Sequence, residues 1–343
     1  MKVHQFPDRI IEIDNNEYLY FGGTAYLGLP THPEFQKRLI KNILQWGTAY
    51  GSSRSANIQL TAYENGERFL ASYIKADAAL TVSSGMLAGK LVIEALIPQT
   101  DCFFHFPDTH PAIKAPNSLP FFIGEQLNPR LTDNVIEKIT ILTDAVPSFH
   151  IEPIDLSVLN SISSTKEITM IIDESHSLGI LGAKGCGIFS TIDLPVIKRK
   201  IMVSSLGKAF GLTGGVIASD VDFINQMSNQ DSFVASAGMN AAFVQTMADT
   251  EEIYVTQHQK LKDNLSFIAA HLIKNEAVHF NPDYPLIYPE IEGLNAIFTA
   301  NKIIVTNFKY PTDTKDLNRI VITANHKRED LIKIIHILNQ NQF

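Results

Sequence analysis

Three polar clusters stand where apolar runs of the sequence end, and each carries side chains that could do chemistry. They are residues 83–85 (SSG) after the run AALTV, residues 173–176 (DESH) after TMII, and residues 204–208 (SSLGK) after KIMV. Short apolar runs that alternate with helical stretches are typical of parallel sheets. Ligands of such sheets bind outside the carboxyl ends of the strands. We therefore expect the three clusters to surround one ligand.

The third cluster contains a single ammonium group, Lys208, among small and apolar neighbours. A lysine that its surroundings desolvate has a lowered pKa and becomes a nucleophile toward carbonyl groups. A carboxylate at the end of a buried run, such as Asp173, is costly unless a cationic group pairs with it. Ser84, Gly85 and Met86 open a helical stretch, where free N–H groups and the helix dipole attract an anion. An amine, a carboxylate and an anion seat together fit pyridoxal phosphate (PLP), which needs all three.

Each of these features alone has an ordinary structural explanation. The turn at residues 83–86 could be a serine-capped helix start, and Asp173 could be a satisfied structural carboxylate. His176 could ligate a metal, but no third ligand stands near it in the sequence, so we expect no metal site. The glycines of GILGAKGCG do not follow the order of a dinucleotide loop, and no Walker motif is present. The combination of the three clusters, in this order, indicates the PLP site.

The composition excludes several classes of protein. The chain has 343 residues, 45% of them hydrophobic, and a net charge of −8. This acidic balance is unlike the basic footprint of a nucleic-acid binder, and no run reaches the roughly 18 apolar residues of a membrane helix. The stretch MKVHQFPDRIIEIDNNEYLYF lacks the apolar core of a signal peptide, and Cys102 and Cys186 make neither a disulfide framework nor a zinc set. We expect a cytoplasmic enzyme with no nucleic-acid or membrane partner.

The elements that must position the clusters fall into three parts. Residues 1–45 are expected to form an N-terminal segment, an extended arm with short strands followed by a helix over PEFQKRLIKNILQWG. Residues 46–225 alternate short apolar runs with helical stretches, which predicts a large α/β domain with a mainly parallel central sheet flanked by helices. Residues 226–343 combine long helical patterns with the strand-like pieces KIIVTNF and NRIVITA, which predicts a smaller α+β domain.

In motif order, the chain resembles the PLP-dependent α-oxoamine synthases, which have the aspartate-aminotransferase fold (fold type I). This family includes 8-amino-7-oxononanoate synthases and 2-amino-3-ketobutyrate CoA ligases, and it joins an amino acid to an acyl thioester with loss of carbon dioxide. The resemblance covers nearly the whole chain, and DESHSLGILGAKGCG is its most specific match. The other matches are AYLGLPTHPE, GTAYGSSR, SSGMLAG, DTHPAI, SSLGKAFGLTGG and NRIVITANH.

The resemblance implies roles for individual residues. Lys208 would join the cofactor aldehyde, Asp173 would bond the pyridinium nitrogen, and His176 would contact the phenolic oxygen, so these three would carry the catalysis. His110 would stack on the ring face, and Arg319 would grip the substrate carboxylate through a bidentate fork. Without the resemblance, His110 and Arg319 would be read as ordinary surface residues. The phosphate would be held by Ser84, Gly85, Met86, Ser205 and, from a partner subunit, Ser236. The resemblance thus implies a homodimer with shared active sites.

The chain departs from the family pattern at four positions. Thr24, the candidate substrate contact, stands where the family has the asparagine that helps to hold the amino acid. Tyr63 replaces a histidine, Met86 an aromatic residue after the phosphate-turn glycine, and Gly207 a serine before the lysine. The chain is also shorter than typical members, chiefly between His110 and Asp173 and again in its last third. The amino acid, the acyl chain and the choice between CoA and a carrier protein therefore stay open.

The substrates expected from the resemblance are an amino acid and an acyl-CoA or acyl-carrier thioester. The specific pair would be L-alanine and a pimeloyl thioester, a step of biotin synthesis. A class I/II aminotransferase on the same scaffold needs the same lysine, aspartate and arginine, so it remains the alternative enzyme. A non-catalytic relative could keep the fold for binding or dimerisation, although the intact Lys208 and Asp173 argue against this.

Overall fold

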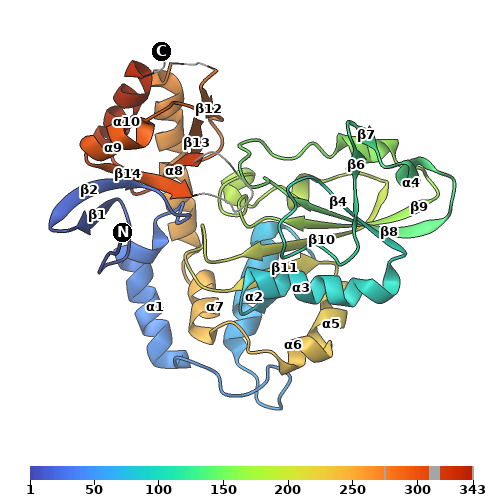
Figure 1. Ribbon diagram of the computed structural model, residues 1–343. Coiled ribbons are helices and arrows are strands. Elements are labelled where there is room, and N and C mark those ends of the chain that lie inside the picture. The colour runs from blue at the N-terminus through green and yellow to red at the C-terminus, as the bar shows by residue number, and fades with distance from the viewer. Residues whose placement is uncertain (274–275, 309–316, 342–343) are drawn as a thin grey trace.

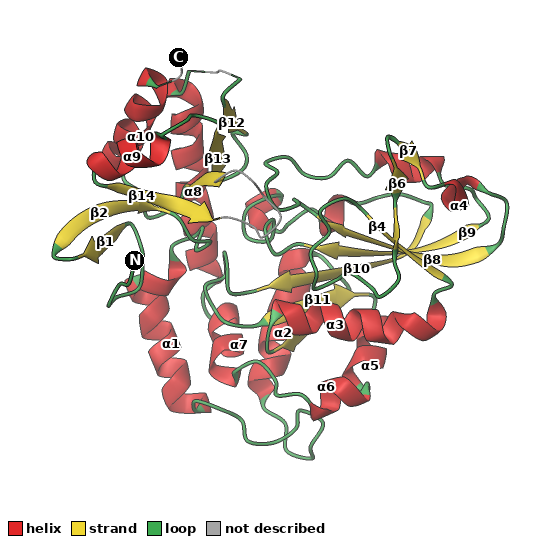
Figure 2. Ribbon diagram, in the orientation of Figure 1, coloured by secondary structure: helices red, strands yellow, loops and turns green. Residues whose placement is uncertain are grey.

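Two β-sheets organise the chain, and helices pack against both of them (Figures 1 and 2). The computed structural model describes residues 1–273, 276–308 and 317–341. The larger sheet runs in the order β3 (Ala78–Val82), β11 (Gly215–Ser219), β10 (Ile197–Ser205), β9 (Lys166–Asp173), β8 (Glu137–Asp144), β4 (Cys102–His105) and β5 (Leu119–Pro120). The strands from β10 to β5 pair in parallel, and only β11 runs against its two neighbours. The expected mainly parallel central sheet is thereby confirmed.

Both faces of this sheet are buried, as its continuous apolar strands predict. Successive side chains of a strand point to opposite faces. In β9, Met170 and Ile172 accordingly pack in one apolar cluster, while Ile171 packs in a second cluster across the sheet. The helices that pack near the sheet are α2 (Thr61–Ile74), α3 (Gly85–Leu96) and α5 (Val221–Ser228). The carboxyl ends of the strands are thus held on a rigid support.

The smaller sheet combines strands from both ends of the chain. Its order is β1 (Ile10–Ile13), β2 (Asn16–Phe21), β14 (Ile303–Phe308), β15 (Leu317–Val321), β13 (Leu286–Pro289) and β12 (Val278–Phe280). The N-terminal arm joins it through β2, which pairs in parallel with β14, so that Leu19 lies opposite Ile303. Around this sheet lie α8 (Glu251–His271), α9 (Leu294–Ala300) and α10 (Arg328–Gln340) (Figure 1).

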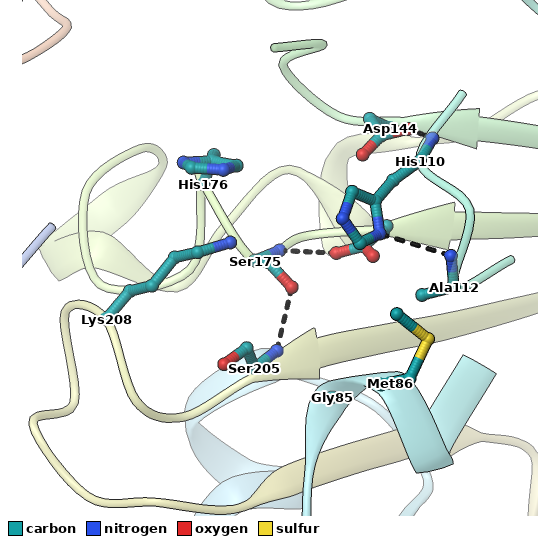
Figure 3. Close-up of a pocket in the computed structure, with 10 residues that line it drawn as sticks. Gly85, Met86, His110, Ala112, Asp144, Ser175, His176, Ser205 and Lys208 are labelled. Atoms are coloured by element: carbon teal, nitrogen blue, oxygen red, sulfur yellow. Dashed lines mark hydrogen bonds between the residues drawn. The ribbon is translucent and has the colours of Figure 1, made fainter. Parts of the chain in front are cut away.

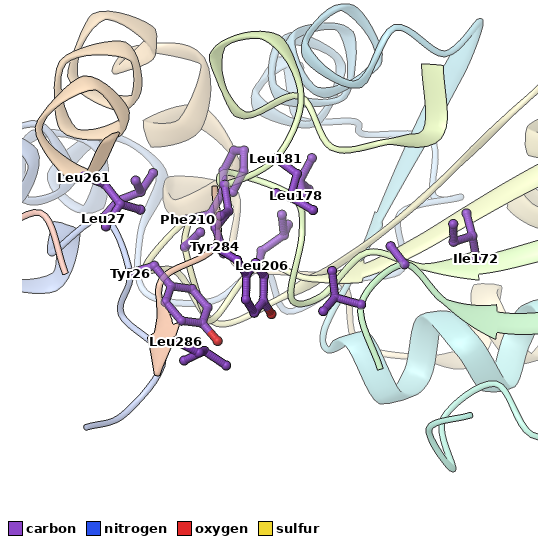
Figure 4. Close-up of a cluster of buried hydrophobic side chains, with 14 of the residues drawn as sticks. Tyr26, Leu27, Ile172, Leu178, Leu181, Leu206, Phe210, Leu261, Tyr284 and Leu286 are labelled. Atoms are coloured by element: carbon purple, nitrogen blue, oxygen red, sulfur yellow. The ribbon is translucent and has the colours of Figure 1, made fainter. Parts of the chain in front are cut away.

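The apolar core is continuous between the two sheets (Figure 4). Tyr26 and Leu27 of the N-terminal segment pack in the same cluster as Leu206, which directly follows β10 of the central sheet, and Leu286 of the small sheet. Further helices are α1 (Pro33–Trp46), α4 (Pro129–Thr132), α6 (Asp231–Ala235) and α7 (Ala241–Ala248), and β6 (Phe122–Ile123) pairs with β7 (Gln126–Leu127). The shared core means that the loops between the sheets are fixed by packing from both sides.

Helix α7 lies against both α1 and α2. A buried hydrogen bond between Asn42 Nδ2 and Thr246 Oγ1, 3.0 Å long, joins α1 to α7. The division of the chain into parts at residues 45 and 225 remains a prediction.

Short 3₁₀ turns connect several of these elements. They span Leu29–Thr31, Ile97–Gln99, Ser157–Ser161, Ala183–Gly185 and Phe189–Thr191. Among the described residues, no helix combines the length and the apolar character that crossing a membrane requires.

Candidate active site

A cavity of about 180 Å³ opens at the carboxyl end of the central sheet (Figure 3). Strands β8, β9 and β10, the loop after β10 and the start of α3 all contribute to it. The residues that line it are Gly85, Met86, His110, Ala112, Asp144, Asp173, Ser175, His176, Ser205 and Lys208. The structure therefore brings the three polar clusters of the sequence together around one space, as expected for a parallel sheet.

Lys208 lies in the loop between β10 and β11 and extends its side chain into the cavity (Figure 3). The loop is held by buried Leu206 and Phe210 and by a hydrogen bond from Leu212 N to Leu206 O of 3.1 Å. Burial lowers the pKa of Lys208, while the charge of Asp173 opposes this shift. The amine is therefore neutral more often than that of an exposed lysine, which makes it a better base and nucleophile.

Asp173 is the last residue of β9 and only 5% of its surface is exposed. Its Oδ1 accepts a hydrogen bond of 2.8 Å from the backbone N–H of Ser175. The Ser175 hydroxyl in turn accepts from Ser205 N, also at 2.8 Å, which ties the end of β9 to the end of β10. These hydrogen bonds fix the position of the Asp173 carboxyl group at the floor of the cavity.

The next residue, Glu174, faces away from the cavity and anchors the following loop. Its fully buried carboxylate accepts from Ser177 Oγ at 2.6 Å and from the backbone N–H groups of Ile188 and Phe189. A Cβ at Gly187 would come within 2.1 Å of Glu174 Oε2, and the φ of Gly187 is +80°, so this position requires glycine. Burial raises the pKa of Glu174 to about 7, while its three donors oppose the shift.

The anion seat lies at the N-terminus of α3. Ser84 is the N-cap, and its hydroxyl accepts from Leu87 N at 3.1 Å. A Cβ at Gly85 would come within 2.8 Å of Ser205 Cα, so only glycine lets the helix approach the end of β10 this closely. Met86 lines the cavity and is 47% exposed. Free N–H groups of the first turn and the positive end of the helix dipole therefore border the cavity.

His110 faces the cavity from the loop after β4 (Figure 3). Its backbone N–H donates to Asp144 Oδ2 at 2.8 Å, and its Nδ1 accepts from Ala112 N at 3.2 Å. Burial lowers the pKa of His110, and an accepting Nδ1 requires that the proton of the neutral ring sit on Nε2. The ring is thus an uncharged flat surface suited to stacking on a ligand.

His176 is fixed by a residue that sequence reasoning had not selected. The hydroxyl of Tyr26 lies 3.0 Å from His176 Nδ1, and Tyr26 is fully buried. Burial lowers the pKa of His176 well below 6.5 and raises that of Tyr26, so both groups are neutral. Tyr26 stands in the AYLGLPTHPE motif, for whose tyrosine the family resemblance implies no role.

Asp144 and Ser175 also line the cavity, and neither of them was selected from the sequence as a site residue. Asp144 is the last residue of β8, so it follows the same pattern of a carboxylate at the end of an apolar run that had singled out Asp173. Burial, and then the neighbouring charge of Asp173, raise the pKa of Asp144 to about 8. Ser175 lies within the selected DESH cluster, but its role depends on the position of Ser205, which the sequence does not reveal.

Several other predicted residues lie outside the residues that line the cavity. Ser84 serves as the helix cap, and the Ser236 hydroxyl, after α6, donates to Ser232 O. Arg319 lies on β15, and its charge adds to the effect of burial in lowering the pKa of both Lys208 and His176. Thr24 accepts from Tyr26 N at 2.9 Å through its carbonyl oxygen.

The structure shows what surrounds two of the positions that depart from the family pattern, Tyr63 and Gly207. The Tyr63 hydroxyl donates to Met239 O at 2.8 Å, and its ring lies 4.1 Å beneath the guanidinium of Arg54, so it packs between two segments. A Cβ at Gly207 would meet only Ser205 Oγ, at 3.6 Å, which is an ordinary contact. The loop could therefore carry the family's serine without moving. Within the described part of the chain, no three His, Cys, Asp or Glu side chains are grouped as metal ligands would be.

The chain is similar to known proteins over most of its length. An 8-amino-7-oxononanoate synthase of Thermoanaerobacter pseudethanolicus is 26% identical over 347 residues, which cover 93% of this chain and 86% of that protein. The structure of a Sphingomonas wittichii serine palmitoyltransferase matches with a TM-score of 0.82 and 18% identity, over 97% of this chain and 89% of that one. A serine palmitoyltransferase of S. paucimobilis, solved with a bound PLP–myriocin aldimine, matches with a TM-score of 0.82 and 17% identity, over 99% and 91% of the chains.

These structural matches confirm the expected fold-type I architecture. The family model for aminotransferase class I and II matches residues 154–338, which include β9, the Lys208 loop and the chain from there as far as α10. That stretch is more than half of the chain. The chain is therefore a member of the class I and II aminotransferase family.

Proposed function

We propose that this chain is a PLP-dependent α-oxoamine synthase, which condenses an amino acid with an acyl thioester and releases carbon dioxide. The observation that carries the proposal is the meeting of the Lys208 amine and the Asp173 carboxylate in one cavity. The similarity to an 8-amino-7-oxononanoate synthase supports acyl transfer. The specific reaction we propose is that of this enzyme, between L-alanine and a pimeloyl thioester, in the synthesis of biotin.

The residues of the cavity fit PLP. The tight approach of Gly85 to Ser205 leaves the first turn of α3 open toward the cavity, where a phosphate group finds N–H donors. Asp173 offers a fixed carboxylate for a ring nitrogen, His110 a neutral ring face, and Lys208 an amine. When bound, PLP supplies an aldehyde for the amine and an electron-withdrawing ring that stabilises negative charge on the α-carbon of the substrate.

The residues of the chain would then move and hold protons. Because burial lowers the pKa of Lys208, its neutral Nζ can take the proton from the α-carbon of the amino acid. The Asp173 carboxylate would accept a hydrogen bond from the ring nitrogen and keep the proton on it. Tyr26 occupies Nδ1 of His176, which leaves Nε2 to face a ligand; in the tautomer in which the Tyr26 hydroxyl donates to Nδ1, Nε2 carries the proton and can donate to an oxygen that gains negative charge.

Arg319 would hold the carboxylate of the amino acid. Its effect on the pKa of Lys208 and His176 supports a position beside the cavity. A guanidinium binds a carboxylate through two parallel hydrogen bonds, which fixes the orientation of the substrate as well as its position. Thr24, in the segment that leads to Tyr26, would be a second contact of the amino acid.

The reaction can be told apart from transamination by its products. With PLP, L-alanine and pimeloyl-CoA, we expect the protein to release free CoA thiol in proportion to carbon dioxide. Thiol reagents and carbon dioxide capture measure the two products. An exchange of amino acid for keto acid without thiol would favour the aminotransferase alternative. A protein that stays colourless with added PLP would favour the non-catalytic alternative.

We also propose a homodimer with shared active sites, in the cytoplasm. Ser236 lies outside the residues that line the cavity of its own subunit, as a residue serving a partner's phosphate site would. Large apolar side chains exposed on and after α1, Ile40, Leu44 and Ile58, support burial against a second copy. The two free, buried cysteines suit a reducing compartment.

Light scattering tests the dimer directly. We expect a mass of twice the 38.1 kDa of the chain, and we expect Ser236→Ala to weaken PLP binding without changing that mass. A monomer that releases thiol at full rate would contradict the shared site.

A further inference from the structure

Two carboxyl groups lie side by side at the floor of the cavity. Asp144 ends β8, Asp173 ends β9, and the two residues are direct partners in the parallel register of these strands. Neighbouring strands are about 4.8 Å apart, and register partners point to the same face of the sheet. Both side chains line the cavity and are about 5% exposed. Two buried anions this close repel each other strongly, so one of them is stabilised by taking up a proton.

The surroundings of the two carboxyls differ. Asp173 is the stronger electrostatic partner of the Lys208 ammonium, with Asp144 second. Asp173 also accepts from Ser175 N, whereas Asp144 accepts from the backbone N–H of His110. The cation favours the negative charge on Asp173, which leaves Asp144 as the carboxyl better able to stay neutral.

We propose that Asp144 and Asp173 share a single proton, that Asp144 carries it, and that Asp173 alone presents a negative charge to the ring nitrogen of PLP. The role of Asp173 toward the ring nitrogen rests on the function proposed above, because that nitrogen belongs to PLP. Asp144 is then a positioning residue. Its neutral carboxyl holds the backbone of His110 at 2.8 Å and leaves one anion, rather than two, beneath the ligand.

The titration of Asp144 depends on every charged group that faces it. The net pKa of Asp144 is about 8; burial, then the charge of Asp173 from β9 and, more weakly, the charge of Asp108 from the loop after β4 raise it. The N–H of His110, from the same loop, and Lys208, from the loop after β10, lower it. The rise outweighs the fall, which agrees with a neutral Asp144 at neutral pH.

The infrared spectrum of the full-length chain, recorded across a pH range without added PLP, tests the shared proton. A protonated carboxylic acid has a C=O stretch that the carboxylate lacks. We expect this band to be present at pH values below about 8 in the wild type and to be lost in Asp144→Asn. Because Glu174 also has a raised pKa, the difference between wild type and variant is the quantity to compare.

Two matched variants complete the design. Asp108→Asn removes an exposed carboxylate of the same region, which lies 3.3 Å from His150, and should keep the band. Asp173→Asn removes the repelling charge, so the midpoint of the Asp144 band should fall by at least about one pH unit. A band that is unchanged in Asp144→Asn, or a midpoint that does not fall in Asp173→Asn, would overturn the proposal. The second comparison decides the matter even if Asp144→Asn does not fold.

Binding of PLP, followed by its visible absorbance, separates this inference from the proposed function. An asparagine at position 144 is as neutral as the proposed acid and can still accept from His110 N. We therefore expect the affinity of Asp144→Asn for PLP to lie within about threefold of that of the wild type. A loss of affinity of about thirtyfold or more would mean that the substitution had removed a negative charge. If neither protein binds PLP, the proposed function fails, and the infrared comparison still decides where the proton lies.

Discussion

Replacing Lys208 by alanine is expected to lower kcat for thiol release by at least about 10⁴-fold. The variant loses the amine that the structure directs into the cavity, and with it both the covalent attachment of the cofactor and the base for the α-proton. Lys208→Arg should be equally inactive, because a guanidinium stays charged at any accessible pH. Kinetics with L-alanine and an acyl-CoA, together with the visible spectrum of the purified protein, measure the loss.

Covalent trapping separates this loss from unfolding. Borohydride should fix the cofactor on the wild-type peptide that contains Lys208 and on no peptide of the Ala variant. Lys198→Ala is the matched control, since Lys198 lies on the same strand, β10, and is exposed in an ion pair with Glu167. We expect the control to keep its activity and its colour. Turnover by Lys208→Ala within tenfold of the wild type would refute the role of the lysine.

Replacing Asp173 by asparagine is expected to lower kcat by about 10²–10³-fold, with a smaller effect on KM. Asparagine can still accept the hydrogen bond from Ser175 N, so the end of β9 should keep its position. It carries no negative charge, and the ring nitrogen would no longer be held in its protonated form. The measurement is steady-state kinetics combined with a pH titration of the visible absorbance of bound PLP.

Asp108→Asn, which removes an exposed carboxylate, serves as the control for Asp173→Asn as well. The comparison with Asp144→Asn is sharper, because both variants remove a carboxyl group from the same floor of the cavity. We expect a large loss of kcat only at position 173. Equal losses at positions 144 and 173 would mean that both groups act as anions, in disagreement with a shared proton.

The polar clusters, and the parallel sheet that positions them, could be predicted from the sequence. An apolar run followed by polar residues marks the end of a buried strand, and parallel strands bring such ends together, so Asp173, Ser205 and Lys208 could be predicted to meet. The same rule applied to KITILTD would have found Asp144, since that run also ends in a carboxylate. What the sequence could not supply was the order of strands, which makes β8 the neighbour of β9.

Contacts between segments far apart in the chain could not be predicted from the sequence either, because local sequence patterns do not reveal which segments become neighbours in the fold. The bond between Tyr26 and His176 joins residues 150 positions apart. Nothing in the local pattern of either segment specifies that distance, because it follows from how the two sheets pack on one core. The composition of the small sheet is a similar case, since β1 and β2 come from the N-terminal arm while the other strands follow residue 277.

The parallel pairing of β2 with β14 also has a consequence for biosynthesis. Leu19 leaves the ribosome long before Ile303, its partner across the ladder. At the usual rate of about 5–20 residues per second, the early strand waits roughly 15–60 seconds for its neighbour. The central sheet has every strand available by residue 219 and can fold meanwhile, whereas one edge of β2 stays unpaired and open to pairing with other chains. Translation speed thus sets how long the newborn polypeptide is vulnerable to aggregation.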